Sequence, residues 1–141
     1  YFGKNSRLDD LQASILNIKL KYLDQENSSR ITVASRYFNE IKNQFIILPK
    51  WSFTRDHVFH LFVIRTNFRE KLKSYLYKKG VGTMIHYPIP PHKQKILSNY
   101  KNMKLPITDK IHNQVLSLPC HPWLKEKEQG IIIELCNNFK P

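Results

Sequence analysis

The sequence has 141 residues, of which 41% are hydrophobic and 12% aromatic, so it can form one folded domain with a packed core and is not disordered throughout. Twenty-three Lys and Arg against eleven Asp and Glu give a formal net charge of +12, which favours anionic partners, although the lysines are spread along the chain like a solvated surface. No apolar run approaches the roughly 20 residues of a membrane helix, and two cysteines, Cys120 and Cys136, form neither a disulfide framework nor a CxxC metal site.

The first predicted element is a long helix between residues 6 and 44, a stretch without Pro or Gly. Ser6 is the predicted N-cap, with Asp9 as its weak capping-box partner. Apolar residues follow at helical spacing: Leu8, Leu11, Ile15, Ile18 and Tyr22. Polar residues 24–30 are either a break between two helices or the exposed middle of one. A continuous helix would span roughly 55 Å at about 1.5 Å per residue, so we expect it to reach a partner or a part absent from this sequence.

Beyond Pro49 the pattern alternates between strands and helices, which predicts an α/β or α+β domain. The predicted elements are a strand over 57–66, a helix over 67–80 with Asn67 as cap and Gly80 as stop, a strand over 81–87, a short helix over 105–115 with Thr108 as cap, an extended segment over 116–119 and a last helix over 124–139.

The segment TMIHYPIPPHKQ, residues 83–94, ends a predicted strand on His86 and Tyr87. Three prolines follow, and they exclude a helix until after Pro91. Polar residues on a stiffened strand end often line a site. The alternative is structural, with Tyr87 in the core and His86 bonded only to backbone.

Other residues carry weaker signals. His57 and His60 would lie on opposite faces of a strand, which does not favour a metal site. Trp51 and Trp123 are expected to pack, and the aromatic residues do not form a basic stacking surface for nucleic acid. In YFGKNSR, Asn5 and Arg7 precede a helix N-terminus, where they either cap the helix or bind an anion.

Taken together, these segments resemble the C-terminal part of the DegT/DnrJ/EryC1/StrS aminotransferases. The resemblance covers nearly the whole chain and rests on FGKNSRLDDLQASILNIKLKYLD, HVFHLFVIR, GVGTMIHYPIPPHKQ and VLSLPCHPWLKEKE, in that order. Its most specific parts are the patterns G-x-N-x-R-x-D-x-x-Q-A and H-Y-P-x-P-x-H-x-Q.

The resemblance implies a fold-type I aminotransferase that uses pyridoxal 5'-phosphate to aminate a nucleotide-linked keto sugar, with glutamate as the default amino donor. It implies a cytoplasmic homodimer, without nucleic-acid or membrane partners, that makes amino sugars for lipopolysaccharide, O-antigen or capsule. A minority of the family catalyses other pyridoxal-phosphate reactions, such as dehydration.

The resemblance also assigns regions and residues. Residues 1–46 would form the loop and linking helix, and 47–141 the small C-terminal α/β domain. Asn5 would reach the cofactor phosphate of the partner subunit, with Arg7 beside it, and His86 and Tyr87 would lie near the sugar.

The family's Schiff-base lysine and the aspartate that pairs with the pyridine nitrogen lie upstream of the G-x-N-x-R loop. No lysine here stands in that context, and Lys4 lies inside the loop itself. We therefore expect no catalytic centre in this chain alone and no large cofactor-binding domain. The alternative is a stand-alone basic α/β module that binds nucleic acid or a phosphorylated ligand.

Overall fold

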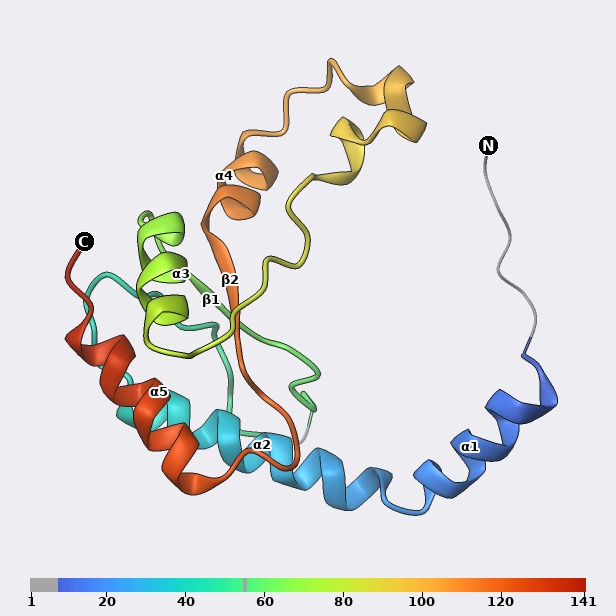
Figure 1. Cartoon of the computed structure of the whole chain (residues 1–141). Coiled ribbons are helices and arrows are strands. Elements are labelled where there is room, and N and C mark those ends of the chain that lie inside the picture. The colour runs from blue at the N-terminus through green and yellow to red at the C-terminus, as the bar shows by residue number, and fades with distance from the viewer. Residues whose placement is uncertain (1–7, 55) are drawn as a thin grey trace.

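The computed structural model describes residues 8–54 and 56–141 (Figure 1). The elements, in chain order, are α1 (Asp10–Leu20), α2 (Leu23–Glu40), β1 (Phe62–Arg65), α3 (Arg69–Lys78), the 3-10 helices η1 (Pro91–Lys93) and η2 (Lys95–Tyr100), α4 (Pro106–Gln114), β2 (Val115–Leu118) and α5 (Glu126–Asn138). None of the described helices combines the length and apolar character that crossing a membrane requires.

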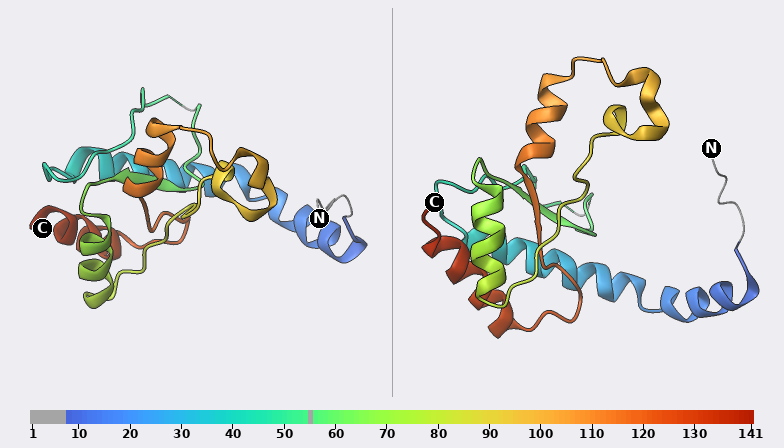
Figure 2. Two further views of the ribbon diagram at one scale, coloured as in Figure 1. Left: turned by 90° about the horizontal axis from the view of Figure 1, so that it is seen from above. Right: turned by 45° about the horizontal axis from the view of Figure 1, so that its top comes forward.

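The predicted N-terminal helix is two helices, and the break falls at residues 21–22 rather than within 24–30. The polar residues 24–30 belong to α2, so they do not break the helix. Asp9, rather than the predicted Ser6, is the N-cap of α1, because its carboxylate accepts a 2.8 Å hydrogen bond from the backbone N–H of Gln12. Ser6 itself lies outside the described residues. Both views of Figure 2 show α1 continuing beyond α2 and away from the rest of the folded chain, which is called the body below.

A small antiparallel sheet forms the centre of the body. β1 pairs with β2 from Phe62 opposite Leu118 to Arg65 opposite Val115. Single bridges extend the sheet on both sides, Ile47 to Arg65 and Met84 to Ser117. The strand predicted over 81–87 is therefore reduced to one bridge at Met84, and the strand predicted over 57–66 begins only at Phe62.

One hydrophobic core joins α2, the sheet, α3 and α5. Its fully buried members include Ala34, Tyr37, Phe62, Ile64, Leu72, Leu76, Leu116 and Cys136. Tyr37 also donates a 2.8 Å hydrogen bond to the carbonyl of Pro119, which ties α2 to the end of β2. Burial raises the pKa of the Tyr37 phenol, so the group stays protonated as a donor.

The later helices follow the predicted pattern with different ends. α3 buries Leu72 and Leu76 as expected and stops at Gly80, whose φ of 83° glycine adopts without strain. α4 begins with Pro106 at its first turn, so Thr108 is not its cap. Trp51 packs among aromatic rings, but Trp123 is 67% exposed, so the prediction that Trp123 packs is wrong.

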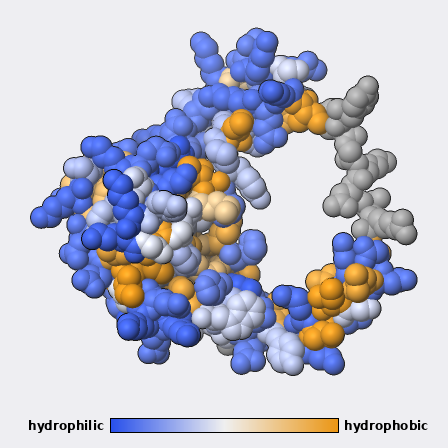
Figure 3. Space-filling model, viewed as in Figure 1, coloured by the Kyte–Doolittle hydropathy of each residue, from blue (hydrophilic) through white to orange (hydrophobic). Residues whose placement is uncertain are grey.

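Two extensions project from the body, and they flank an open space. One is α1, and the other is the arm over residues 88–105, which carries η1 and η2 and returns to α4 (Figure 1). The space-filling view shows the opening between them and apolar side chains gathered on α1 (Figure 3). One face of the body borders this opening.

Candidate functional site

His86 is held at the edge of the sheet by β2. Met84 and Ser117 exchange backbone hydrogen bonds of 2.8 and 3.3 Å, and they bring residues 84–86 alongside β2. The His86 Nδ1 atom then shares a 2.9 Å hydrogen bond with the Oγ atom of Ser117, a residue that is 5% exposed. Because Nδ1 is engaged, Nε2 is the ring nitrogen left for a ligand. The reading in which His86 bonds only to backbone is therefore wrong.

Tyr87 is fixed through its backbone while its ring stays in solvent. His112 of α4 donates from Nδ1 to the carbonyl oxygen of Tyr87, with 2.7 Å between the two atoms. The carbonyl can only accept, so the proton lies on Nδ1 of His112. Tyr87 is 68% exposed and meets the His86 ring edge-on, with 5.8 Å between centroids. Tyr87 is therefore not a core residue of this chain. The peptide bond between His86 and Tyr87 is cis.

The loop after Tyr87 is tied back to α4. Pro90 is buried, and the 3-10 helix η1 begins at Pro91 itself, one residue earlier than predicted, because a proline fits the first turn of a helix. The Nζ atom of Lys93 lies 2.7 Å from Oδ1 of Asp109 on α4. The hydrogen bond from Lys93 holds the pKa of the Asp109 carboxyl below its usual range. This pair links the base of the arm to the element that also holds Tyr87.

A surface pocket of about 360 Å³ lies beside His86. Its polar and sulfur-bearing lining residues are His60, Thr83, Met84, His86, Ser117 and Cys120. Sequence reasoning placed His60 on a strand and gave it no role. The structure instead places His60 in the loop before β1. The spacing of apolar and polar residues in the sequence does not predict that His60 lies in a loop.

The remaining predicted site residues, Asn5 and Arg7, lie outside the described residues. His57 accepts a hydrogen bond of 2.9 Å at Nδ1 from the backbone N–H of Phe59, which gives it a local structural role. Within residues 8–54 and 56–141, no group of three or more potential ligands is placed to hold a metal ion. The described part of the chain thus concentrates its candidate residues around His86 and Tyr87.

Comparison with known proteins identifies the family of this chain. The sequence profile of the DegT/DnrJ/EryC1/StrS aminotransferase family matches residues 1–136, and the chain belongs to that family. A dTDP-3-amino-3,6-dideoxy-alpha-D-galactopyranose transaminase from Aneurinibacillus thermoaerophilus is 47% identical over 97% of the chain and 38% of its own length. A UDP-2-acetamido-2-deoxy-3-oxo-D-glucuronate aminotransferase from Pseudomonas aeruginosa is 39% identical over 96% of the chain and 38% of its own length. The chain thus spans well under half of these relatives and corresponds to a C-terminal portion.

Solved structures agree in fold. DesV from S. venezuelae, in complex with a ketimine intermediate, superposes with a TM-score of 0.87 at 35% identity, over 96% of this chain and 37% of DesV. NtdA from Bacillus subtilis, with bound cofactor PMP, gives a TM-score of 0.83 at 36% identity, over 96% of this chain and 33% of NtdA. The mixed helical fold with its two-stranded sheet is the small α/β domain of this class of enzyme, as the sequence predicted.

The family's cofactor is pyridoxal phosphate, which a lysine holds covalently. Among the lysines that the structure describes, all are exposed except Lys73 of α3, which is half-buried. A cofactor-bearing lysine works in an enclosed pocket where its pKa is lowered. The described residues therefore do not by themselves fit a covalently held pyridoxal phosphate.

Proposed function

We propose that this chain is the small domain and linking helix of an aminotransferase that transfers an amino group from glutamate to a nucleotide-linked keto sugar. Membership of the family supports the reaction class. The names of the relatives, which act on dTDP-linked and UDP-linked sugars, support the substrate class. Pyridoxal phosphate would be bound mainly by residues outside this chain, and the chain alone would be inactive.

The observation that carries the proposal is that His86 and Tyr87 are both held at the face of the body that borders the opening between α1 and the arm. Two separate elements hold them, β2 through Ser117 and α4 through His112. Imidazole and phenol groups donate hydrogen bonds to sugar hydroxyls or phosphate oxygens. Because the His86 ring and the Tyr87 backbone are held in advance, less conformational entropy is lost when the substrate binds. We assign His86 and Tyr87 to substrate binding.

The second part of the proposal concerns assembly. The enzyme would be a cytoplasmic homodimer in which Asn5 and Arg7 reach the cofactor phosphate of the partner subunit. The exposed apolar side chains of α1 support a contact with another domain or subunit, because monomeric proteins rarely leave large apolar patches bare. Its product would be an amino sugar for lipopolysaccharide, O-antigen or capsule.

The test is an activity assay on the longer protein that carries this chain. A panel of dTDP-linked and UDP-linked 3-keto and 4-keto sugars is incubated with glutamate and pyridoxal phosphate, and the products are identified by mass spectrometry. We expect one sugar to gain an amino group while 2-oxoglutarate accumulates. Loss of water without amino transfer would identify a dehydratase, and the absence of any reaction would contradict the proposal.

A further inference from the structure

The loop that precedes β1 turns sharply at a residue that rarely makes such turns. Phe59 has a φ of 50°, in the left-handed region that is uncommon for a bulky side chain. Strained backbone of this kind persists only where the surroundings enforce it, and it is concentrated at functional sites. The turn therefore calls for a reason beyond connecting two elements.

The surroundings of Phe59 do enforce the turn. Its side chain is 2% exposed, and its ring lies 4.7 Å from Trp51 and 4.1 Å from His57, measured between centroids. The His57 ring also accepts the hydrogen bond from the Phe59 backbone N–H. Phe59 is thus anchored in an aromatic cluster that joins α2 to β1 and consists of Phe38, Trp51, Phe53, Phe59 and Phe62.

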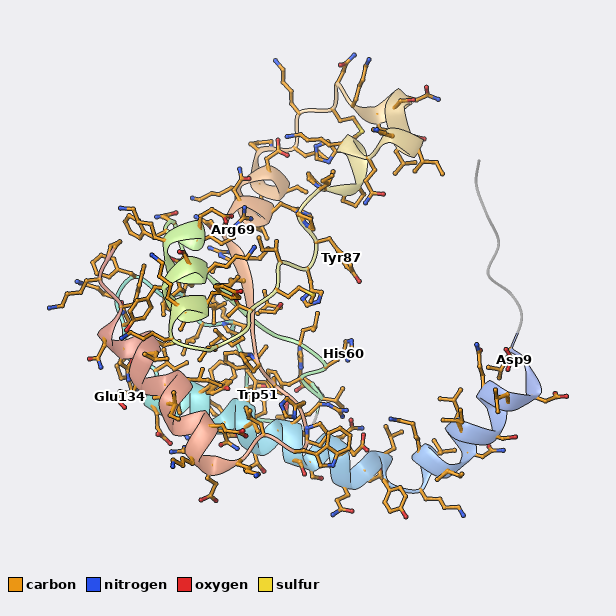
Figure 4. All side chains as sticks on the ribbon, viewed as in Figure 1. Asp9, Trp51, His60, Arg69, Tyr87 and Glu134 are labelled. Carbon is orange, nitrogen blue, oxygen red and sulfur yellow. The ribbon has the colours of Figure 1, made fainter. Side chains whose placement is uncertain are left out.

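The turn determines where the next residue, His60, lies. It is exposed, although it stands two residues before the buried start of β1. In Figure 4 the side chains of His60 and Tyr87 both point toward the opening between the body and α1. His60 also lines the same pocket as His86. Two segments that are far apart in sequence thus direct three polar rings to one face.

The chemistry of the pocket favours an uncharged ligand that carries hydroxyl groups. Its polar side chains are those of His60, Thr83, His86 and Ser117, and its lining contains no carboxylate, lysine or arginine among the residues that the structure describes. Imidazole and hydroxyl groups pair with sugar hydroxyls in either direction. A diphosphate would instead favour a fixed cation, as arginine or lysine provides.

We propose that His60 is a substrate-positioning residue, which binds a hydroxyl of the pyranose ring in the pocket that it shares with His86. The assignment rests on the proposed function and names a residue for the sugar end of that substrate. The strained turn at Phe59 and the aromatic cluster around it hold His60 in place before the substrate arrives.

The test measures binding to the longer protein by calorimetry, with dTDP-glucose and UDP-glucose as non-reacting probes and free dTDP and UDP for comparison. His60→Ala should weaken binding of the sugar nucleotide up to about tenfold, as expected for one lost hydrogen bond, and should leave binding of the free nucleotide unchanged. His60→Gln keeps a donor and should recover most of the loss. His121→Ala, which alters an exposed histidine outside the pocket, should change neither.

The outcomes separate the two proposals. A wild-type protein that binds no sugar nucleotide and aminates no keto sugar would overturn the proposed function and this inference together. Wild-type binding that His60→Ala leaves intact would overturn the inference alone. Equal weakening for free nucleotide and sugar nucleotide would also overturn it, because His60 would then act on the diphosphate. A melting temperature unchanged in His60→Ala excludes a loss through unfolding.

Discussion

His86 and Tyr87 are the residues for which the sequence was most informative. A predicted strand that ends on two polar rings and is followed by three prolines indicated a fixed pair at the end of an element. The structure holds the His86 ring through Ser117 of β2 and the Tyr87 carbonyl through His112 of α4. Their partners, Ser117 and His112, were not predictable, because each pairing joins residues 25 to 31 positions apart. His60 was missed for a related reason, since its exposure depends on the turn at Phe59.

The substrate role of this pair gives a kinetic prediction. In the longer protein, His86→Ala and Tyr87→Phe should each lower kcat/KM for the keto sugar by roughly tenfold or more, which corresponds to the loss of a hydrogen bond worth about 1.5 kcal/mol. Cofactor retention should stay nearly unchanged in both variants, and Tyr87→Phe should keep the melting temperature because Tyr87 is exposed. His86→Ala also removes the hydrogen bond to the buried Ser117, so a fall in its melting temperature that is small beside the loss of activity is expected. A fall in melting temperature that parallels the loss of activity would instead mean that the pair stabilises the domain.

The two free cysteines give a prediction about alkaline pH. Burial raises the pKa of Cys120 to about 11 and that of Cys136 to about 12, above the roughly 8.5 of an unfolded thiol. Between about pH 9 and pH 11 the unfolded chain has lost these protons and the folded chain has kept them, so the free energy of unfolding falls as the pH rises.

Urea unfolding at pH 7.5, 9 and 10.5 measures this decline, and Cys120→Ala/Cys136→Ala is the variant in which it should be smaller. At pH 7.5 both thiols should react slowly with a maleimide until the chain unfolds. Fast labelling of Cys136 in the folded protein would contradict its burial.

At the scale of elements, sequence periodicity located the helices better than the strands. α3 and α5 lie where the apolar spacing placed them, and Gly80 ends its helix as expected. The strand ends were less predictable, because β1 and β2 are four residues each and their limits depend on pairing between segments about 50 residues apart. The break between α1 and α2 falls at Lys21 and Tyr22, where no proline or glycine marks it.

α1 carries many apolar residues, yet nothing in the described part of the chain covers them. It has no buried residue, and Leu11, Ile15 and Ile18 are 73%, 51% and 61% exposed. The 141-residue chain should therefore self-associate in solution through this helix, as measured by light scattering across a range of concentrations. Leu11→Gln/Ile15→Gln should make it monomeric without lowering its melting temperature. A wild-type monomer with amides in α1 protected from hydrogen exchange would contradict this prediction.

At the scale of the whole molecule, the chain consists of one packed body with two extensions around an open face (Figures 1 and 3). The division into a linking region over 1–46 and a small domain over 47–141 stays a prediction, and α2 contributes Val33, Ala34 and Tyr37 to the core of the body. The net charge of +12 suggested polyanions, but family membership lends no support to a stand-alone nucleic-acid module. Charge alone could not separate these classes, because basic surfaces suit several kinds of anion.

The most direct test of the central claim is to locate the lysine that carries pyridoxal phosphate. The longer protein is loaded with the cofactor, reduced with borohydride, digested and mapped by mass spectrometry, and the 141-residue chain is treated in parallel. We predict one stoichiometric adduct, on a lysine outside residues 1–141, and no specific adduct on the chain alone. A stoichiometric adduct on one of the lysines of this chain would contradict its assignment as the small domain of an aminotransferase.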